Sequence, residues 1–163
     1  MSMISIATLR RMSREQLAEL LLSRDASKVA VVDVRDDDYV GGHIHGSKHV
    51  PSCDLDHRIP EIVRTLADRQ TVVFHCALSQ QRGPSAALRY IRERESKMKK
   101  GELGTASPNQ DSNIQDEGMQ QEQASRGDQG IYVLDQGFVG WQQKYGMDER
   151  LTDAYAPDIW ADY

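Results

Sequence analysis

The chain has 163 residues, which is enough for one domain with one sizeable hydrophobic core. A formal net charge of -5 with no basic stripe argues against a nucleic-acid partner, and no apolar run reaches the length of a membrane span. The two cysteines, Cys53 and Cys76, are too few for a disulfide framework and favour a reducing compartment, so we expect a cytoplasmic or nuclear protein.

The N-terminal part of the chain alternates between strand and helix patterns. Residues 4–9 predict a first strand, and a capping-box sequence beginning at Ser13 predicts the start of a leucine-rich helix. The continuous apolar run at 28–34 predicts a strand that is buried on both faces of a parallel sheet. A short extended piece follows at 48–51.

The same alternation continues through the rest of the chain. Residues 60–66 predict a helix with its proline in the first turn, and 71–76 predict a strand. A helix is expected at 84–97 and a last strand at 131–135. Such alternation indicates βαβ units, so the expected fold class is α/β, with a parallel central sheet flanked by helices.

The composition changes between residues 97 and 130. This stretch is rich in Gln, Gly, Ser and Asp, contains no aromatic residue, and offers only Leu103 and Ile114 as branched aliphatic residues. It cannot bury enough apolar surface to offset its ordering entropy. We therefore expect a disordered surface insertion within a single domain that spans 1–163, with a regulatory role as the less favoured alternative to a solvated linker.

The most informative feature is the segment from Cys76 to Arg82, which reads C-x5-R between the predicted strand and the predicted helix. In a strand–loop–helix arrangement, the loop N–H groups and the helix N-terminus converge on one anion. The same field stabilises the thiolate of Cys76, and the planar fork of Arg82 suits bidentate binding of a tetrahedral oxyanion. The arrangement predicts a nucleophilic cysteine that attacks phosphorus, arsenic or sulfur. An inert, buried cysteine at the end of a core strand is the alternative.

Besides the catalytic pair Cys76 and Arg82, the rest of the loop supplies the predicted oxyanion-binding groups. These residues are Ala77, Leu78, Ser79, Gln80, Gln81 and Gly83. His75 is expected to fix the loop by hydrogen bonding rather than to act as a base. No metal site is expected, because the acidic run from Asp36 to Asp38 lacks a His or Cys framework and resembles a solvated turn.

Three blocks of sequence resemble the rhodanese-homology family, and within it the M-phase inducer phosphatases and the fungal arsenate reductases. The blocks are Val32-Asp-Val-Arg35 with Tyr39-Val-Gly-Gly-His-Ile-His-Gly46, Phe74-His-Cys-Ala-Leu-Ser-Gln-Gln-Arg-Gly-Pro-Ser-Ala86, and Ile131 to Trp141. The resemblance implies a single rhodanese-like domain. It also implies that Asp33 and Arg35 are scaffold residues, with Arg35 pairing a nearby acid for which Asp38 is one candidate.

The loop departs from that of the M-phase inducer phosphatases at two points. Those enzymes carry acidic residues directly after the Cys and directly before the Arg, where this chain has Ala77 and Gln81. An intraloop carboxylate therefore cannot protonate a leaving group here. The family's protective cysteine is also replaced, by Val34, which leaves Cys53 as a bystander or as a disulfide partner of Cys76.

The leading functional hypothesis is a cysteine-dependent phosphatase of the protein-tyrosine type that forms a phosphocysteine and needs no metal or cofactor. Its substrate would be a phosphoprotein or a small oxyanion. The alternative is an arsenate reductase that uses glutathione and glutaredoxin as reductant. A catalytically weak phosphopeptide-binding module ranks third. Sulfurtransferase activity ranks last. The resemblance to the family implies that its sulfurtransferases have a loop one residue shorter than the Cys76–Arg82 loop of this chain.

Overall fold

The computed structural model describes residues 5, 8–99 and 129–161, and its core is a parallel sheet of five strands. The strand order is β1-β6-β5-β2-β4, so that β5 is central. The strands are β1 (Arg10–Met12), β2 (Val29–Asp33), β4 (Lys48–His49), β5 (Thr71–His75) and β6 (Gly130–Leu134). A separate antiparallel pair joins β3 (His43–Ile44) to β7 (Thr152–Asp153).

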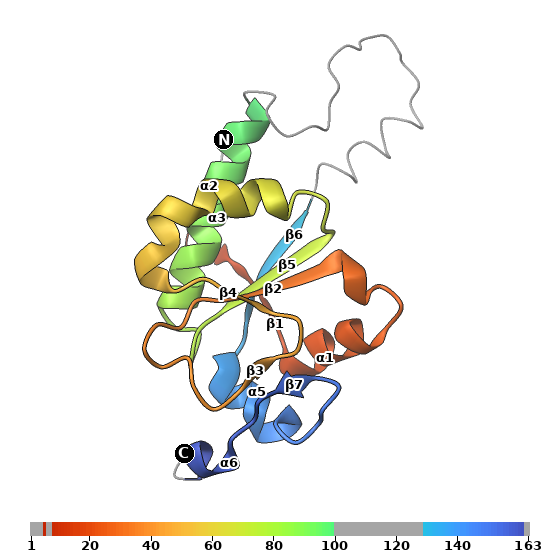
Figure 1. The fold of residues 1–163 in the computed structure, drawn as a ribbon. Helices are drawn as coiled ribbons and strands as arrows, with labels where there is room; N and C mark the ends of the chain where they lie inside the picture. The colour runs from red at the N-terminus through yellow and green to blue at the C-terminus, as the bar shows by residue number, and fades with distance from the viewer. Residues whose placement is uncertain (1–4, 6–7, 100–128, 162–163) are drawn as a thin grey trace.

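Helices cover both faces of this sheet, as Figure 1 shows. They are α1 (Arg14–Leu22), α2 (Leu55–Thr65), α3 (Arg82–Lys99), α5 (Gly137–Tyr145) and α6 (Pro157–Trp160), with 3-10 turns at Ala26–Lys28 and Ser52–Asp54. One core cluster joins α2 and α3 to one face of the sheet, and a second joins α1 and α5 to the other. The α/β prediction with a parallel central sheet is therefore confirmed.

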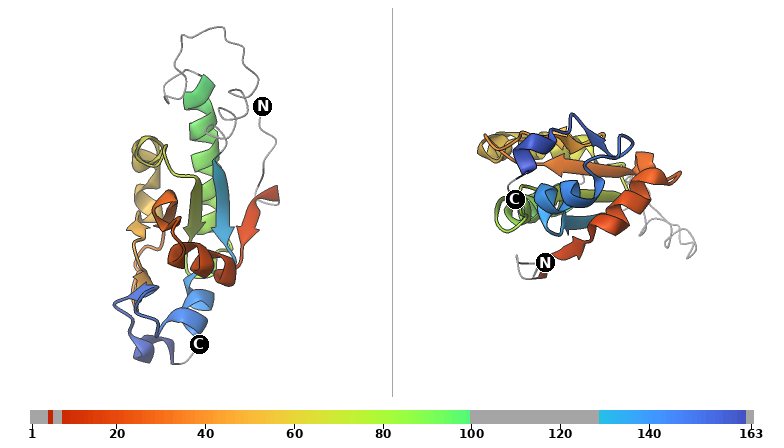
Figure 2. Two further views of the ribbon diagram at one scale, coloured as in Figure 1. Left: turned by 90° about the vertical axis from the view of Figure 1, so that its right-hand side faces the viewer. Right: turned by 90° about the horizontal axis from the view of Figure 1, so that it is seen from below.

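The central strand β5 shows why the sheet is buried on both faces. Val72 and Phe74 belong to the cluster on the α2–α3 side, whereas Val73 belongs to the cluster on the α1–α5 side. This alternation follows from the two-residue period of a strand, and all three side chains are fully buried. Because the five strands are parallel, their carboxyl ends meet at one edge of the sheet. The elements β3, β7, α5 and α6 lie at this edge in Figure 1 and in the left view of Figure 2.

The capping box predicted at the start of the first helix is present. The Ser13 side chain accepts a hydrogen bond from the backbone N–H of Gln16, and the Gln16 side chain accepts one from the N–H of Ser13. Two of the N–H groups that a helix terminus leaves without partners are thus satisfied. The predicted strands at 28–34, 71–76 and 131–135 are also present as β2, β5 and β6.

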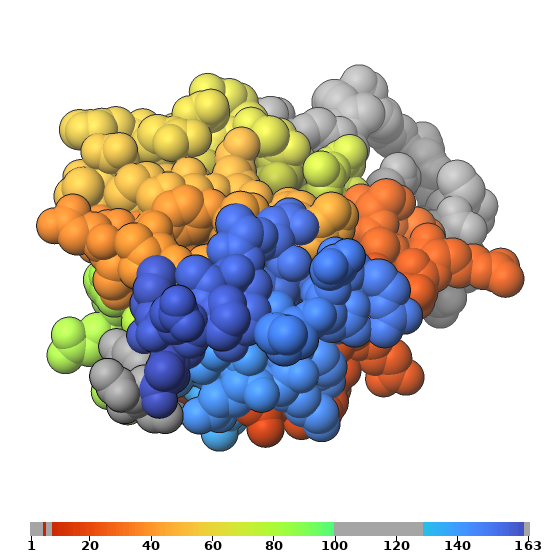
Figure 3. Space-filling view, turned by 60° about the horizontal axis from the view of Figure 1, so that its bottom comes forward, coloured from red at the N-terminus to blue at the C-terminus, as the bar shows by residue number. Residues whose placement is uncertain are grey.

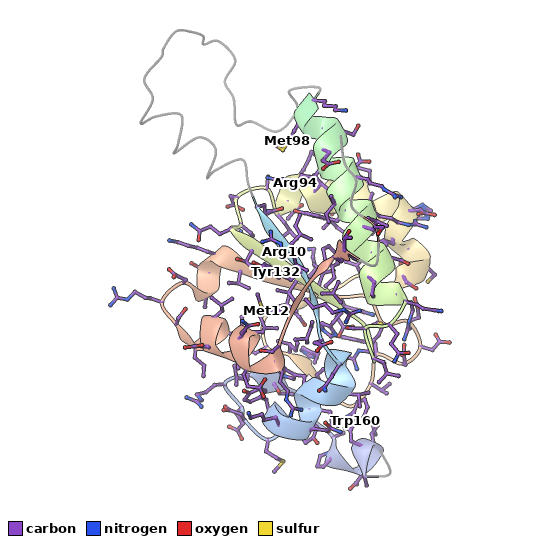
Figure 4. All side chains as sticks on the ribbon, turned by 180° about the vertical axis from the view of Figure 1, so that it is seen from behind. Arg10, Met12, Arg94, Met98, Tyr132 and Trp160 are labelled. Atoms are coloured by element: carbon purple, nitrogen blue, oxygen red, sulfur yellow. The ribbon has the colours of Figure 1, made fainter. Side chains whose placement is uncertain are left out.

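The strand predicted at 4–9 is wrong in position, because the first strand is Arg10–Met12. It pairs in parallel with β6. Its two arginines are exposed, and their side chains contact residues of β6 or directly after it. The guanidinium carbon of Arg10 lies 4.8 Å from the ring centre of Tyr132, and Arg11 pairs with Asp135 at 3.2 Å. Figure 4 labels Arg10 and Tyr132 on neighbouring strands. An edge strand tolerates such polar residues, which the apolar pattern does not reveal. Residues 1–4, 6 and 7 lie outside the described residues.

The helix predicted at 60–66 is also wrong in its start, since α2 begins at Leu55 and Pro60 lies inside it. A proline in a helix interior costs about 3 kcal/mol, because it removes one hydrogen bond and crowds the preceding turn. Leu55 and Ile59 are both buried, and burying each such side chain is worth about 1.5–3 kcal/mol. The apolar contacts of the extra turns therefore offset the cost of the proline.

Of the insertion expected at 97–130, residues 100–128 lie outside the described residues. Its two ends belong to the ordered fold, since α3 continues to Lys99 and β6 begins at Gly130. Within the part of the chain that the structure describes, no helix combines the length and apolar character that spanning a membrane requires.

Candidate active site

The loop after β5 folds around the sulfur of Cys76. Cys76 is 3% exposed, and the backbone N–H of Ser79 donates to its Sγ at 3.2 Å. Ser79 itself is buried and has φ 58, a left-handed conformation that is uncommon outside glycine. This reversal turns successive N–H groups toward one side of the loop, which is the arrangement of an anion-binding nest.

The carbonyl groups of the loop are held from outside by other elements. The carbonyls of Cys76 and Ala77 accept hydrogen bonds from the backbone N–H groups of Phe138 and Val139, both at 3.0 Å. The carbonyl of Ser79 accepts from the Arg11 guanidinium at 3.1 Å. These bonds point carbonyl oxygens away from the sulfur, so the loop presents donors rather than acceptors to an anion.

The loop ends where α3 begins, at Arg82. The next residue, Gly83, packs against the end of β5, and an added Cβ would lie 3.2 Å from the Cα of His75 and 3.3 Å from the N of Cys76. The absence of a side chain thus lets the helix N-terminus approach the cysteine closely. Ala77 is partly buried, whereas Leu78, Gln80 and Gln81 are exposed at the surface of the loop.

The guanidinium of Arg82 is engaged by two carboxylates that follow β2. Nη1 and Nη2 lie 2.9 and 2.6 Å from the two carboxylate oxygens of Asp38, and Nη1 lies 3.3 Å from Oδ2 of Asp36. The hydrogen bonds that Arg82 donates lower the pKa of Asp38 to about 2, and the same bonds raise the pKa of Arg82. The prediction that this acidic run is a solvated turn is therefore wrong for Asp36 and Asp38, while Asp37 is exposed.

A buried ion pair between Asp33 and Arg35 lies at the carboxyl end of β2. Both side chains are fully buried, and Nη2 of Arg35 lies 2.7 Å from Oδ2 of Asp33. Burial opposes ionisation of Asp33, but the hydrogen bonds and the charge of Arg35 outweigh it, and the pKa of Asp33 is lowered. Arg35 does pair with an acid as expected, but the acid is Asp33, and the side chain of Asp38 binds Arg82 instead.

His75 is completely buried between the ion pair and the loop. Its Nδ1 lies 3.0 Å from the carbonyl oxygen of Cys76, and its Nε2 lies 3.7 Å from Oδ2 of Asp33. Burial lowers the pKa of His75, so the ring is neutral at neutral pH. Because a carbonyl only accepts, the neutral ring carries its proton on Nδ1 and donates it to the loop. This geometry fits the expected structural role better than that of a base.

The two cysteines have different environments. Cys76 is buried and Cys53 is exposed, and both are free thiols. Partial desolvation and the carboxylate of Asp54 raise the pKa of Cys53, which makes it a poorer nucleophile at neutral pH. Its backbone N–H donates to Asp36 at 3.1 Å, so the segment that carries Cys53 helps to hold the carboxylates beside Arg82.

The predicted site residues lie on the loop from Cys76 to Gln81 and in the first turn of α3, which holds Arg82 and Gly83. The structure adds residues that the sequence reasoning missed. The added residues are Asp36 and Asp38, which pair with Arg82, and Arg11, which holds the loop carbonyl. The sequence places these carboxylates shortly after the predicted strand at 28–34, but the strand order of the sheet is needed to bring them beside Arg82. Among the described residues, no group of three or more His, Cys, Asp or Glu side chains could hold a metal ion.

The C-terminal segment lies against the loop that holds these carboxylates. Trp160 is buried, its Nε1 donates to the carbonyl of Gly41 at 2.9 Å, and its ring centre lies 5.6 Å from that of Phe138. In Figure 3, dark-blue C-terminal residues lie beside the orange residues that follow β2. These contacts pack the C-terminal segment against the rest of the fold.

Comparison with known families identifies the family of this chain. The family profile described as the rhodanese-like domain matches residues 13–144. The chain belongs to the rhodanese-like domain family, which agrees with the resemblance seen in the three sequence blocks.

Known relatives fall into two functional groups. The chain is 36% identical over 141 residues to the CDC25-like phosphatase YCH1 of Saccharomyces cerevisiae, a match that covers 80% of this chain and 76% of the relative. It is also 36% identical over 150 residues to arsenate reductase 2.1 of Oryza sativa subsp. japonica, covering 89% and 76% of the two chains. The relatives are thus rhodanese-family enzymes of both kinds.

Two solved structures that resemble this chain carry related functional descriptions. The yeast protein Ygr203w, described as a protein tyrosine phosphatase of the rhodanese family, superposes with a TM-score of 0.64 at 31% identity, covering 96% of this chain and 99% of that one. An As-Sb reductase from Leishmania major also gives a TM-score of 0.64, at 26% identity, covering 89% and 85% of the two chains. The shared fold therefore supports both functions equally.

The first prediction concerns Gly137, which has φ +60 and whose added Cβ would overlap the carbonyl groups of Cys76 and Ala77. Gly137→Ala should lower the free energy of unfolding by the cost of a left-handed alanine, about 1–2 kcal/mol, and by an overlap cost of about 1–3 kcal/mol. The matched control is Gly46→Ala, because Gly46 has φ +80 but open space around its Cβ position. Urea unfolding measures both, and equal losses would contradict the close approach of α5 to the loop.

The second prediction concerns the buried ion pair. Asp33→Asn leaves the charge of Arg35 buried without a partner and should cost about 3–5 kcal/mol of unfolding free energy. The control is Asp148→Asn, since Asp148 and Arg150 have the same spacing and a similar two-pronged geometry, with Arg150 69% exposed. The control should change the urea midpoint little. Similar losses in the two variants would show that burial of Asp33 and Arg35 is not what stabilises this region.

Proposed function

We propose that this chain is a cysteine-dependent phosphatase of the protein-tyrosine type, acting on phosphotyrosine or a similar aryl phosphate. The observation that carries the proposal is the loop geometry: the Ser79 N–H donates to Sγ of Cys76, and Arg82 begins α3 beside the carboxylates that hold its guanidinium. The loop thus combines a nucleophile, converging backbone donors and a bidentate cation. The name of the yeast relative and the description of the yeast structure support this choice.

The reaction proceeds through a covalent intermediate on the cysteine. The Sγ thiolate of Cys76 attacks phosphorus, the bond to the leaving oxygen breaks, and a phosphocysteine forms. Water then attacks phosphorus and the thiolate of Cys76 departs, which regenerates the enzyme. Arg82 and the N–H groups from Ala77 to Gly83 stabilise the equatorial oxygens in both steps. Because α5 and Arg11 hold the loop carbonyls, the N–H groups of the loop are already oriented, and little reorganisation is needed during the reaction.

Arsenate reduction is the second candidate, because a relative of equal identity and the Leishmania structure carry that name. Cys76 would attack arsenic and displace an arsenate oxygen as water. Glutathione, with glutaredoxin, would then supply the two electrons that reduce arsenic and release arsenite. The lack of a carboxylate within the loop favours this chemistry mildly. We place either activity in the cytoplasm or nucleus, since a catalytic thiol requires a reducing compartment.

A comparison of the two cysteines tests the function. Cys76→Ser should abolish phosphate release from an aryl phosphate, because the hydroxyl is a far weaker nucleophile in this loop. Cys53→Ser is the matched control and should retain wild-type turnover. The same samples are assayed for arsenate reduction with glutathione and glutaredoxin.

The outcomes separate the candidates. Phosphate release that is lost only in Cys76→Ser, without arsenate turnover, supports the phosphatase. Arsenate turnover with negligible phosphate release establishes the reductase instead. Full phosphatase activity in Cys76→Ser would contradict the proposal, and no turnover of either substrate by the wild type would favour a binding module.

A further inference from the structure

The guanidinium that should bind an oxyanion is held by a carboxylate of the chain itself. Both Nη atoms of Arg82 contact the two oxygens of Asp38, at 2.9 and 2.6 Å. Carboxylates and phosphates present paired oxygens to a guanidinium in the same planar geometry. A substrate oxyanion that uses this pair of nitrogens must therefore compete with Asp38 for Arg82.

The charges around the loop favour uptake of a proton by a carboxyl when a substrate oxyanion binds. The carboxylates of Asp36 and Asp38 carry two negative charges against the single positive charge of Arg82. Asp33 and Arg35 cancel each other nearby. A dianionic phosphate adds two more negative charges, and like charges at such distances raise the pKa of a carboxyl. Uptake of one proton by a carboxyl relieves this repulsion.

The contacts identify which carboxyl is released. Asp36 keeps the Ser52 hydroxyl at 2.5 Å and the Cys53 N–H at 3.1 Å after Arg82 turns away. Asp38 keeps the N–H of Asp36 on Oδ1 at 2.9 Å, whereas Oδ2 is bound to Arg82 among the described residues. The Asp38 side chain is 40% exposed, so water can deliver a proton to it. Asp38 is therefore the carboxyl that becomes available on substrate binding.

We propose that Asp38 is the general acid and base of this site, released from Arg82 when the substrate oxyanion binds. This inference rests on the phosphatase function proposed above and supplies the proton donor that the loop, with Ala77 and Gln81, lacks. The Asp38 carboxyl lies beside Arg82 at the end of the loop, and the proposal places the leaving oxygen of a substrate bound by that guanidinium next to it. The substrate itself thus switches Asp38 from partner of Arg82 to acid.

The proton and electron pairs balance over the two steps. In the first step the thiolate of Cys76 forms a bond to phosphorus, the bond to the leaving oxygen breaks, and that oxygen takes the proton of the Asp38 carboxyl. In the second step Asp38 accepts a proton from the attacking water. The new oxygen–phosphorus bond forms, and the bond from sulfur to phosphorus breaks to return the thiolate. Asp38 then returns this proton to bulk water and, as a carboxylate, re-forms its pair with Arg82 as phosphate leaves.

The test compares Asp38→Asn with Asp37→Asn, which removes the same charge from the neighbouring exposed residue. The kcat is measured for phenyl phosphate, a poor leaving group, and p-nitrophenyl phosphate, a good one. Asp38→Asn should lower kcat for phenyl phosphate about a hundredfold or more, and for p-nitrophenyl phosphate less than about tenfold. The dissociation constant for inorganic phosphate should fall about two- to fivefold, which is the range of an exposed ion pair. Asp37→Asn should match the wild type in all three measurements.

Each result has one meaning. Equal losses on both substrates would overturn the inference and leave Asp38 as a positioning residue for Arg82. Unchanged kinetics in Asp38→Asn, with wild-type turnover that depends on Cys76, would overturn it while leaving the phosphatase function intact. If the wild type hydrolyses neither substrate, the phosphatase function fails. In that case, an unchanged dissociation constant for phosphate in Asp38→Asn would also overturn the competition between Asp38 and the oxyanion for Arg82. A lower dissociation constant in this variant would support that competition.

Discussion

The buried pair of Asp33 and Arg35 is the interaction on which the site depends. Arg35 donates to Asp33 and to the carbonyls of Val40 and Gly42 at 3.2 and 2.9 Å, and its guanidinium lies 4.3 Å from the ring centre of Phe138. The pair therefore joins the end of β2, the loop that follows it and the start of α5. Because Asp36 and Asp38 lie in that loop, the pair also fixes where the carboxylates meet Arg82. The cost of desolvating two charges is met by these additional hydrogen bonds.

The cysteine loop is preorganised by elements on both sides. Backbone N–H groups of α5 and the guanidinium of Arg11 donate to loop carbonyls, while the N–H of Ser79 donates to the sulfur and Gly83 lets the start of α3 lie close to the backbone of Cys76. Donors fixed in this way stabilise developing negative charge without reorganising during the reaction. The same cradle suits phosphate and arsenate, since both are tetrahedral oxyanions. This explains why one fold serves both groups of relatives, and it makes the source of the leaving-group proton a decisive difference between reactions.

Much of the fold could be predicted from the sequence, because its signals were local. The strands β2 and β5 carry continuous apolar runs, at 29–32 and 72–74, and Ser13 with Gln16 forms a capping box within four residues. The errors arose where distant contacts decided the outcome. The edge strand at Arg10–Met12 is held by Tyr132 and Asp135, and the helix through Pro60 is held by the buried Leu55 and Ile59. In the site, Cys76 and Arg82 could be recognised from their spacing, but the partner of Arg82 follows another strand and depends on the sheet order.

The central claim is that Cys76 carries the phosphoryl group during turnover, and trapping that intermediate tests it most directly. The protein is mixed with an excess of an aryl phosphate, quenched rapidly in acid, digested and examined by mass spectrometry. We expect a phosphate adduct on the peptide that contains Cys76 and none on the peptide that contains Cys53. Steady turnover with an adduct on another residue, or with none on Cys76 at any quench time, would contradict the account.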